Sequence, residues 1–196
     1  MPLWGATDSD ESKPKFLTDE QKKQCFATKS GWVLENGALT GNDNANADPE
    51  ILVAIGELAT SIGAADITEI EFITTAFDKS DGGNIDVRVR FNEAVDVVTT
   101  GGTPTLAITN GNQGSGSGRG PHAAAYTSGT GTNELVFSIT IAAGQTTIVE
   151  DDVLVIGANA ISLNSGTIKD AGTSTNSTIT NVEAIGTAAG SITAVA

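Results

Sequence analysis

The side chains that could carry catalysis are few and lie far apart in the sequence. His122 is the only histidine and Cys25 the only cysteine. A Ser–His–Asp triad needs a histidine held between a hydroxyl and a carboxylate. His122 instead follows Pro121 beside a glycine-rich segment, and we expect it to be a solvated loop residue. The GxxxxGK pattern of phosphate-binding loops and the HExxH pattern of zinc enzymes do not occur in the sequence. We therefore expect the protein not to be an enzyme.

Oxygen-rich segments could bind Ca²⁺, which takes carboxylate, amide and carbonyl oxygens as ligands. Residues 42–48 carry oxygen-bearing side chains at alternate positions, but the segment lacks the glycine and the final glutamate of an EF-hand loop. Two acidic clusters, residues 78–84 and 150–152, fall at expected turns, where solvated Asp and Asn side chains are common. We expect no cofactor, and weak Ca²⁺ binding at one of these segments is the alternative.

The composition describes an acidic protein that favours strands and turns. Ten basic and 24 acidic residues give a net charge of −14, which argues against binding nucleic acid through a basic surface. No apolar run reaches the roughly 18 residues of a membrane-spanning helix, and the first residues lack the basic and apolar segments of a signal peptide. We expect the chain to be made in a cytoplasm without export and not to enter a membrane. Cys25 cannot form an internal disulfide and is expected to be a small buried apolar residue.

Two segments alternate apolar and polar side chains with the period of a strand that buries one face. Val87, Val89 and Phe91 share one face of the first segment, and the apolar residues of 133–141 alternate in the same way. Turns rich in Gly, Asn and Asp separate further strands, and residues 111–120 are expected to form an exposed loop. The expected strands are residues 68–75, 85–92, 94–98, 104–109, 122–127, 134–141, 153–156 and 160–163, with 191–195 as a possible last strand. Several short strands at this spacing predict an all-β sandwich or barrel.

Shorter elements precede this β region. Residues 18–21 (Thr-Asp-Glu-Gln) match a capping box and predict a helix of about two turns. Residues 25–28 and 32–35 flank Lys-Ser-Gly and predict a hairpin. In residues 50–57, β-branched residues alternate with other apolar ones, so we prefer a strand to a helix that starts at Pro49.

The boundary between these elements and the β region is expected at residues 59–66, which are small and include a glycine. Residues 1–66 then form an N-terminal arm with a small β-rich anchoring region, and residues 67–196 form the β domain. Charge is distributed unevenly, because residues 1–29 hold five basic and five acidic groups and the rest of the chain carries the whole net charge of −14. This pattern indicates an attachment segment on a solvated body.

Large apolar side chains occur on the otherwise polar first 17 residues. Leu3, Trp4, Phe16 and Leu17 need a surface to bury them, which either the rest of this chain or a neighbouring subunit could supply. Trp32 in the expected hairpin has the same character. We predict that these five residues bind a partner.

Five motifs occur in a fixed order between residues 67 and 182. They are Val-Arg-Val-Arg-Phe-Asn-Glu-Ala-Val at 87–95, Gly-Thr-Pro-Thr-Leu at 102–106, Ala-Tyr-Thr-Ser-Gly-Thr-Gly-Thr-Asn-Glu-Leu-Val-Phe at 125–137, Ala-Gly-Gln at 143–145 and Ile-Lys-Asp-Ala-Gly at 168–172. Together they resemble the immunoglobulin-like repeats of large bacterial surface proteins. The chain departs from that pattern at Asn92, where the repeats carry a hydroxyl residue, and in the loop 111–120. The resemblance implies an Ig-like β-sandwich with a structural or adhesive role and no enzyme activity.

The N-terminus carries a second, shorter resemblance. Met-Pro-Leu-Trp-Gly at 1–5, Ser-Lys-Pro-Lys-Phe-Leu at 12–17 and Gly-Trp-Val at 31–33 are similar to the opening of virion structural proteins of tailed phages, notably T4-like phages of marine cyanobacteria. The resemblance implies a protein located in the virion, and we expect a capsid (head) decoration protein. Its N-terminal region would bind the major capsid protein or other virion proteins, as a homo-oligomer or in many copies. Its sandwich would face solvent and touch host glycans weakly. A tail, neck or baseplate component and a host-surface adhesin module are the alternatives.

Overall fold

The computed structural model describes residues 13–38, 48–110 and 119–196 and shows a chain built mostly from strands. Within these residues strands predominate, with three short helices beside them, which confirms the β-rich prediction. The expected arm residues Leu3 and Trp4, most of the oxygen-rich loop 42–48 and most of the loop 111–120 lie outside the described residues. None of the helices in the described ranges is long and apolar enough to cross a membrane.

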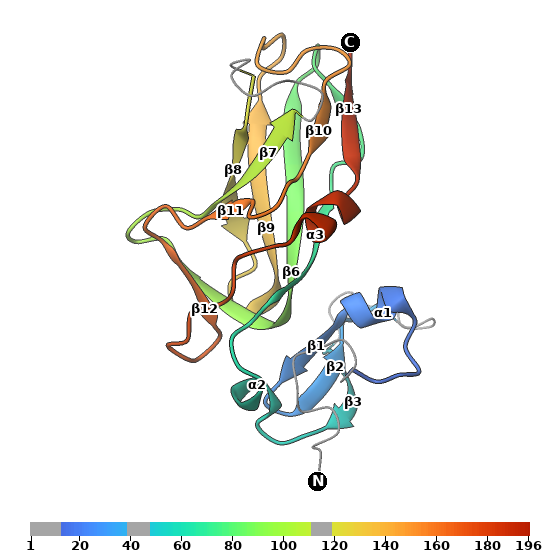
Figure 1. Cartoon of the computed structure of the whole chain (residues 1–196), viewed down its shortest axis with the longest axis vertical. Helices are drawn as coiled ribbons and strands as arrows, with labels where there is room; N and C mark the ends of the chain where they lie inside the picture. Colours follow the sequence, from blue (N-terminus) through green and yellow to red (C-terminus); the bar gives the residue numbers. More distant parts are fainter. Residues whose placement is uncertain (1–12, 39–47, 111–118) are drawn as a thin grey trace.

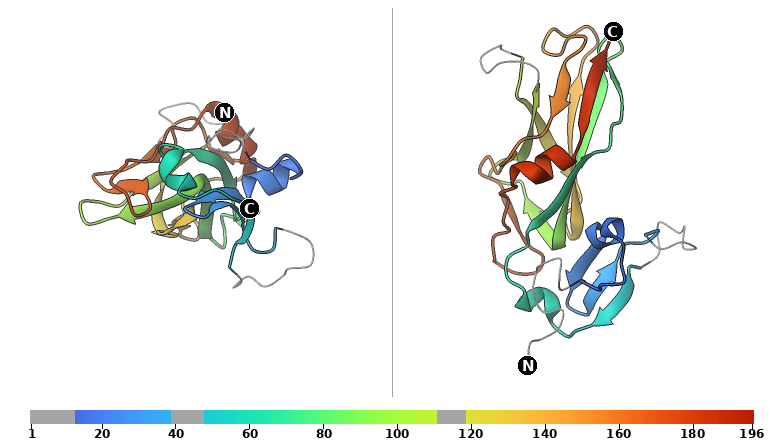
Figure 2. Two further views of the ribbon diagram at one scale, coloured as in Figure 1. Left: turned by 90° about the horizontal axis from the view of Figure 1, so that it is seen from below. Right: turned by 45° about the vertical axis from the view of Figure 1, so that its right-hand side comes forward.

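The chain forms two units that lie end to end along the long axis of the molecule (Figure 1). We call residues 13–38 and 48–62 the N-terminal unit and residues 67–110 and 119–196 the C-terminal unit. Each unit has its own cluster of buried apolar side chains. Figure 2 shows from a second direction that the two units meet over a limited region.

The N-terminal unit begins with a helix whose start is fixed by side chains. α1 (Asp19–Lys23) follows Thr18, whose hydroxyl accepts a hydrogen bond from the Gln21 N–H at 3.2 Å, while the Gln21 side chain accepts one from the Thr18 N–H at 3.0 Å. This reciprocal pair is a capping box, as predicted, because it satisfies two N–H groups that a helix start leaves without partners. The helix has five residues and makes about one and a half turns, fewer than the two turns expected.

A three-stranded sheet follows α1. β1 (Cys25–Thr28) and β2 (Gly31–Leu34) form the predicted hairpin, and β3 (Glu50–Ala54) pairs with β2. The strand preferred over a helix at residues 50–57 is therefore present, but it ends at Ala54. Gly31 has a φ of 133°, and a Cβ there would overlap the Val53 carbonyl oxygen. Only glycine lets β3 approach the hairpin turn this closely.

The apolar side chains of this small sheet form the first core. Trp32 is 0% exposed, and α2 (Leu58–Ser61) packs against the sheet through Leu58. The buried members of this cluster are Leu17, Cys25, Ala27, Trp32, Leu34, Leu58 and Ile62. The buried, apolar position predicted for Cys25 is confirmed.

The C-terminal unit contains the remaining strands and one helix. They are β4 (Ile67–Phe72), β5 (Phe77–Asp78), β6 (Gly83–Val98), β7 (Thr105–Asn110), β8 (His122–Ser128), β9 (Thr132–Ile141), β10 (Val153–Val155), β11 (Ile161–Ser162), β12 (Thr167–Asp170), α3 (Glu183–Ala188) and β13 (Ser191–Val195). The strands expected at 85–92 and 94–98 are one continuous strand, β6. β5, β12 and α3 were not predicted, whereas the possible last strand at 191–195 is present.

β6 is the centre of the strand arrangement. It pairs with β9 and β4 along its first half and with β12 along its second half, all antiparallel. From β9 the order continues through β8, β7, β10, β13 and β5, so that one mixed sheet surrounds the second core. Val87, Val89 and Phe91 of β6 are fully buried in this core together with Leu135 and Phe137 of β9. The alternating faces predicted for both strands are confirmed.

The connection between the units is attached firmly to the C-terminal unit. The Ala65 N–H donates to the Asp170 carboxylate at 2.9 Å, and the Asp66 N–H donates to the Asn92 side-chain oxygen at 2.8 Å. Asn92 also donates its own backbone N–H to the Asp66 carbonyl at 3.0 Å. Ala65 and Asp66 are therefore held by hydrogen bonds to the C-terminal unit and do not act as a free linker.

Because the two cores are separate, a substitution that destabilises one core should have little effect on the other. We expect Trp32→Ala to destabilise the N-terminal unit by about 3–5 kcal/mol, the usual cost of deleting a large buried aromatic side chain. Hydrogen exchange followed by mass spectrometry should show lost protection in β1 and β2 and unchanged protection in the first half of β6 and in β9. Equal loss of protection in both units would contradict this prediction.

Candidate functional site

An ionic cluster around Arg90 joins the two units. Arg90 lies on β6, and its side chain is only 8% exposed. Its guanidinium donates to Glu69 of β4 at 2.5 Å and to Glu134 of β9 at 2.6 Å. The same group lies 3.6 Å from the carboxylate of Glu35, which follows β2 of the N-terminal unit. One buried cation thus links carboxylates from two strands of the C-terminal unit and from the N-terminal hairpin.

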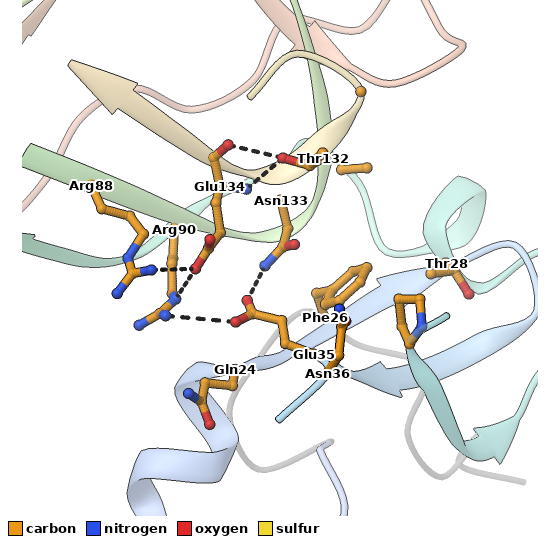
Figure 3. Close-up of a pocket in the computed structure, with 13 residues that line it drawn as sticks. Gln24, Phe26, Thr28, Glu35, Asn36, Arg88, Arg90, Thr132, Asn133 and Glu134 are labelled. Carbon is orange, nitrogen blue, oxygen red and sulfur yellow. Dashed lines mark hydrogen bonds and ion pairs between the residues drawn. The ribbon is translucent and has the colours of Figure 1, made fainter. Parts of the chain in front are cut away.

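Three further contacts cross the junction. The Asn133 amide nitrogen donates to the Glu35 carboxylate at 2.7 Å (Figure 3). On the far side of the cluster, the Lys23 ammonium at the end of α1 lies 3.1 Å from the Glu69 carboxylate. β1 also meets β6 directly through a parallel bridge between Ala27 and Glu93.

This environment changes the ionisation of the cluster. Burial alone would lower the pKa of Arg90, but the hydrogen bond to Glu69 and the charges of Glu35 and Glu134 outweigh it and raise the pKa. Burial likewise favours the neutral form of Glu69, yet its hydrogen bonds with Arg90 and Lys23 outweigh that effect and lower its pKa. Glu69 therefore adds stability at neutral pH that is lost as the pH falls through its folded-state pKa.

Glu35 behaves in the opposite way. Burial raises its pKa, and the hydrogen bond from Asn133 only partly opposes this, while the nearby charge of Glu134 raises it further. A carboxyl group whose pKa is raised by folding costs stability at neutral pH, and this cost is relieved when the group is protonated at lower pH. Glu35 is therefore the carboxylate of the cluster whose charged form is disfavoured by folding.

A pocket of about 660 Å³ opens beside this cluster, between the hairpin and strands β6 and β9. Figure 3 shows Gln24, Phe26 and Glu35 on the side of the N-terminal unit, and Arg88, Arg90 and Glu134 on the other. The full lining comprises Gln24, Phe26, Thr28, Glu35, Asn36, Pro49, Arg88, Arg90, Ala94, Gly131, Thr132, Asn133 and Glu134. The volume lies within the range of small-molecule sites, and neither unit alone forms the pocket.

The residues predicted to bind a partner lie elsewhere. Phe16 is 73% exposed and is the most exposed large apolar side chain in the described parts of the chain. Leu17 and Trp32 are buried in the N-terminal core, so this chain itself covers their apolar surface. Leu3 and Trp4 lie outside the described residues. Partner binding by these five residues stays a prediction, and among the described ones only Phe16 presents a large apolar surface for it.

The prediction for His122 was wrong. The residue is 7% exposed, and its Nε2 lies 3.0 Å from the Asn110 side-chain oxygen. Because the Asn110 amide donates to Asp152 at 3.2 Å, its oxygen is the acceptor, so His122 Nε2 carries the hydrogen. Arg119 also donates to Asp152, at 3.1 Å. The glycine-rich neighbours suggested exposure, but His122 begins β8 and points into a polar cluster.

The acidic turns at 78–84 and 150–152 make hydrogen bonds within the chain. Within residues 13–38, 48–110 and 119–196, no three His, Cys, Asp or Glu side chains come close enough together to hold a metal ion. Asp78 instead accepts a hydrogen bond from the Ser80 N–H at 2.8 Å, an Asx turn. Asp152 is occupied by Asn110, Arg119 and the Val149 N–H.

Comparison with known proteins finds no match among family models, curated proteins or solved structures. The resemblances noted in the sequence therefore stay predictions.

Removal of the central cation tests the junction. We expect Arg90→Met to lower the free energy of unfolding by about 3–5 kcal/mol at pH 7, because it removes the buried cation that three partly buried carboxylates share. Arg88→Met on the same face of β6 is the control: Arg88 is 31% exposed and should cost at most about 1 kcal/mol. Urea denaturation at pH 7 measures both. Equal effects of the two substitutions would contradict a central role for Arg90.

His122 gives the protein a distinct pH dependence. Burial lowers its pKa, and the nearby Asp152 carboxylate only partly opposes this. The unfolded chain therefore binds a proton more readily, so the stability contributed by neutral His122 is complete above about pH 6.5 and is lost as the pH falls through the folded-state pKa. We expect the stability difference between the wild type and His122→Gln to shrink from pH 7.5 to pH 5 in urea denaturation. A difference that stays constant across this range would contradict the prediction.

Proposed function

We propose that this protein is a structural component of a phage virion, most simply a capsid decoration protein that attaches by its N-terminal unit and exposes an Ig-like sandwich. The observation that carries the proposal is the N-terminal unit itself. It has its own apolar core, it presents the exposed Phe16 ahead of α1, and the ionic cluster fixes it on the C-terminal unit. An element built in this way suits a role in attachment rather than in catalysis.

The Ig-like assignment of the C-terminal unit has support from its pairing pattern. β6, β9, β8 and β7 pair as successive antiparallel neighbours, and their inward faces bury one apolar core. Tyr126 of β8 packs edge-on against Phe137 with ring centres 6.1 Å apart, and its hydroxyl accepts a hydrogen bond from the Thr130 N–H at 2.9 Å. The motif at 125–137 thus makes a compact corner between β8 and β9.

Charge supports the proposed orientation. Residues 1–29 carry no net charge, whereas the remainder of the chain carries −14. Like charges would disfavour close packing of the acidic body against an acidic surface, while a neutral segment with an exposed aromatic side chain can approach another protein closely. We propose the major capsid protein or another virion protein as the partner, with this chain in many copies or as a homo-oligomer.

Two other roles are alternatives within this proposal. A tail, neck or baseplate component would use the same attachment unit at a different place on the particle. A host-surface adhesin module would bind cells through the C-terminal unit without needing the attachment unit. The position of the chain in a density map of the whole particle distinguishes a capsid decoration protein from a tail, neck or baseplate component. Cell binding by a chain that lacks residues 1–17 would identify an adhesin module.

The attachment role predicts that the exposed ring of Phe16 contributes directly to particle binding. We expect Phe16→Ser to weaken co-sedimentation with capsids prepared without this protein by tenfold or more, because burying a Phe side chain contributes about 1.5–3 kcal/mol. Val182→Ser is the control, since Val182 is 65% exposed on the C-terminal unit. Deleting residues 1–17 should abolish binding while the C-terminal core stays folded. Unimpaired binding of the shortened chain would refute the attachment role.

A further inference from the structure

The pocket between the units has a charge balance that restricts what it can hold. Its lining contains two guanidinium groups, Arg88 and Arg90, and two carboxylates, Glu35 and Glu134. These groups pair with one another: Glu134 lies 2.6 Å from Arg90 and 3.5 Å from Arg88, and Glu35 lies 3.6 Å from Arg90. A charged ligand would have to displace one of these pairs at the cost of burying the other member alone. The pocket therefore suits an uncharged ligand.

Polar groups in the lining remain able to bind such a ligand. The Gln24 side-chain amide makes no hydrogen bond with any other described residue, so its donor and acceptor are both available. Asn133 donates its nitrogen to Glu35 and keeps its oxygen as an acceptor. The carboxylates of Glu35 and Glu134 can each accept further hydrogen bonds, because a carboxylate offers about four acceptor positions.

An aromatic ring borders the same space. Phe26 of β1 is 8% exposed and shows a small part of its surface to the pocket on the side of the N-terminal unit, opposite the amide and carboxylate groups of β9 (Figure 3). The face of an aromatic ring is weakly negative and attracts polarised C–H groups. A pyranose ring offers both features, since it has an edge of neighbouring hydroxyls and a face of C–H groups.

We propose that this pocket binds a neutral pyranose sugar, with Gln24, Asn133 and Glu134 bonding its hydroxyls and Phe26 packing against its C–H face. Asn133 and Glu134 are held in place before the ligand arrives by their contacts with Glu35 and Arg90, so little ordering cost accompanies their part of the binding. The inference goes beyond the proposed attachment role and does not rest on it. A virion protein attached anywhere on the particle could carry this site.

Saturation-transfer NMR on the full chain tests the proposal. The probes are the neutral methyl glycosides of glucose, galactose, mannose and N-acetylglucosamine, with N-acetylneuraminic acid as the anionic counterpart. We expect signals from at least one neutral glycoside, with a dissociation constant of about 1–10 mM, and none from the acid. No signal from any neutral glycoside, or a stronger signal from the acid, would overturn the proposal.

A filling substitution shows whether the sugar lies in this pocket. Gln24→Trp should weaken binding at least tenfold, whereas Gln145→Trp, at an exposed position on the C-terminal unit, should leave it unchanged. Amide shifts of the wild-type chain during the titration provide a readout independent of either variant: they should be confined to the segments that line the pocket, residues 24–28, 35–36, 88–94 and 131–134. Retained binding in Gln24→Trp, or shifts elsewhere only, would overturn the assignment. A disaccharide that binds more tightly than its monosaccharide identifies a glycan chain as the source, and equal binding identifies a free sugar, both with the site retained.

Discussion

The buried guanidinium of Arg90 is the contact on which the arrangement of the two units depends. Moving an ion out of water costs several kcal/mol, and only close counter-charges repay that cost. Arg90 meets this requirement through Glu69 and Glu134 in its own unit and Glu35 in the other. An apolar contact would tolerate small rotations of the units, but hydrogen bonds to a planar guanidinium lose strength quickly with angle. The cluster therefore favours one relative orientation.

β6 explains why the junction lies where it does. Its ladder with β9 is interrupted between Arg90 and Val95, and at that interruption it meets β1 through Glu93 and holds Asp66 through Asn92. An irregularity of this kind bends a strand and disrupts its pairing locally. The first half of β6 belongs to the core of the C-terminal unit, and its middle serves the junction. Asn92, the residue that departs from the Ig-like repeat pattern, has a specific role there.

Local patterns in the sequence predicted the local parts of this fold. The capping box at Thr18, the hairpin around Ser30 and the period-two faces of β6 and β9 are each set by residues within a few positions of one another. β5 and β12 escaped prediction because two to four residues carry too little periodicity, and they exist through pairing with the distant β13 and β6. The ionic cluster also escaped prediction, because it too depends on contacts between distant parts of the sequence. Glu35, Glu69, Arg90 and Glu134 are each ordinary exposed-looking residues on their own strands, and only the tertiary fold brings them together.

The predictions for the apolar arm and for His122 show that local sequence patterns do not decide whether a residue is buried or exposed. An aromatic residue at a polar terminus signals a need for burial, but the sequence does not say whether the chain or a partner supplies it, and Trp32 is buried internally while Phe16 is not. The same ambiguity applies to charge. Arg88 and Arg90 alternate with apolar residues as a solvated face would, yet they line a pocket because a second unit lies over them. A site formed in this way couples what it binds to the junction: a ligand that bridges Gln24 and Asn133 would add to the contacts that hold the units in place, and loosening of the ionic cluster would weaken its binding in turn.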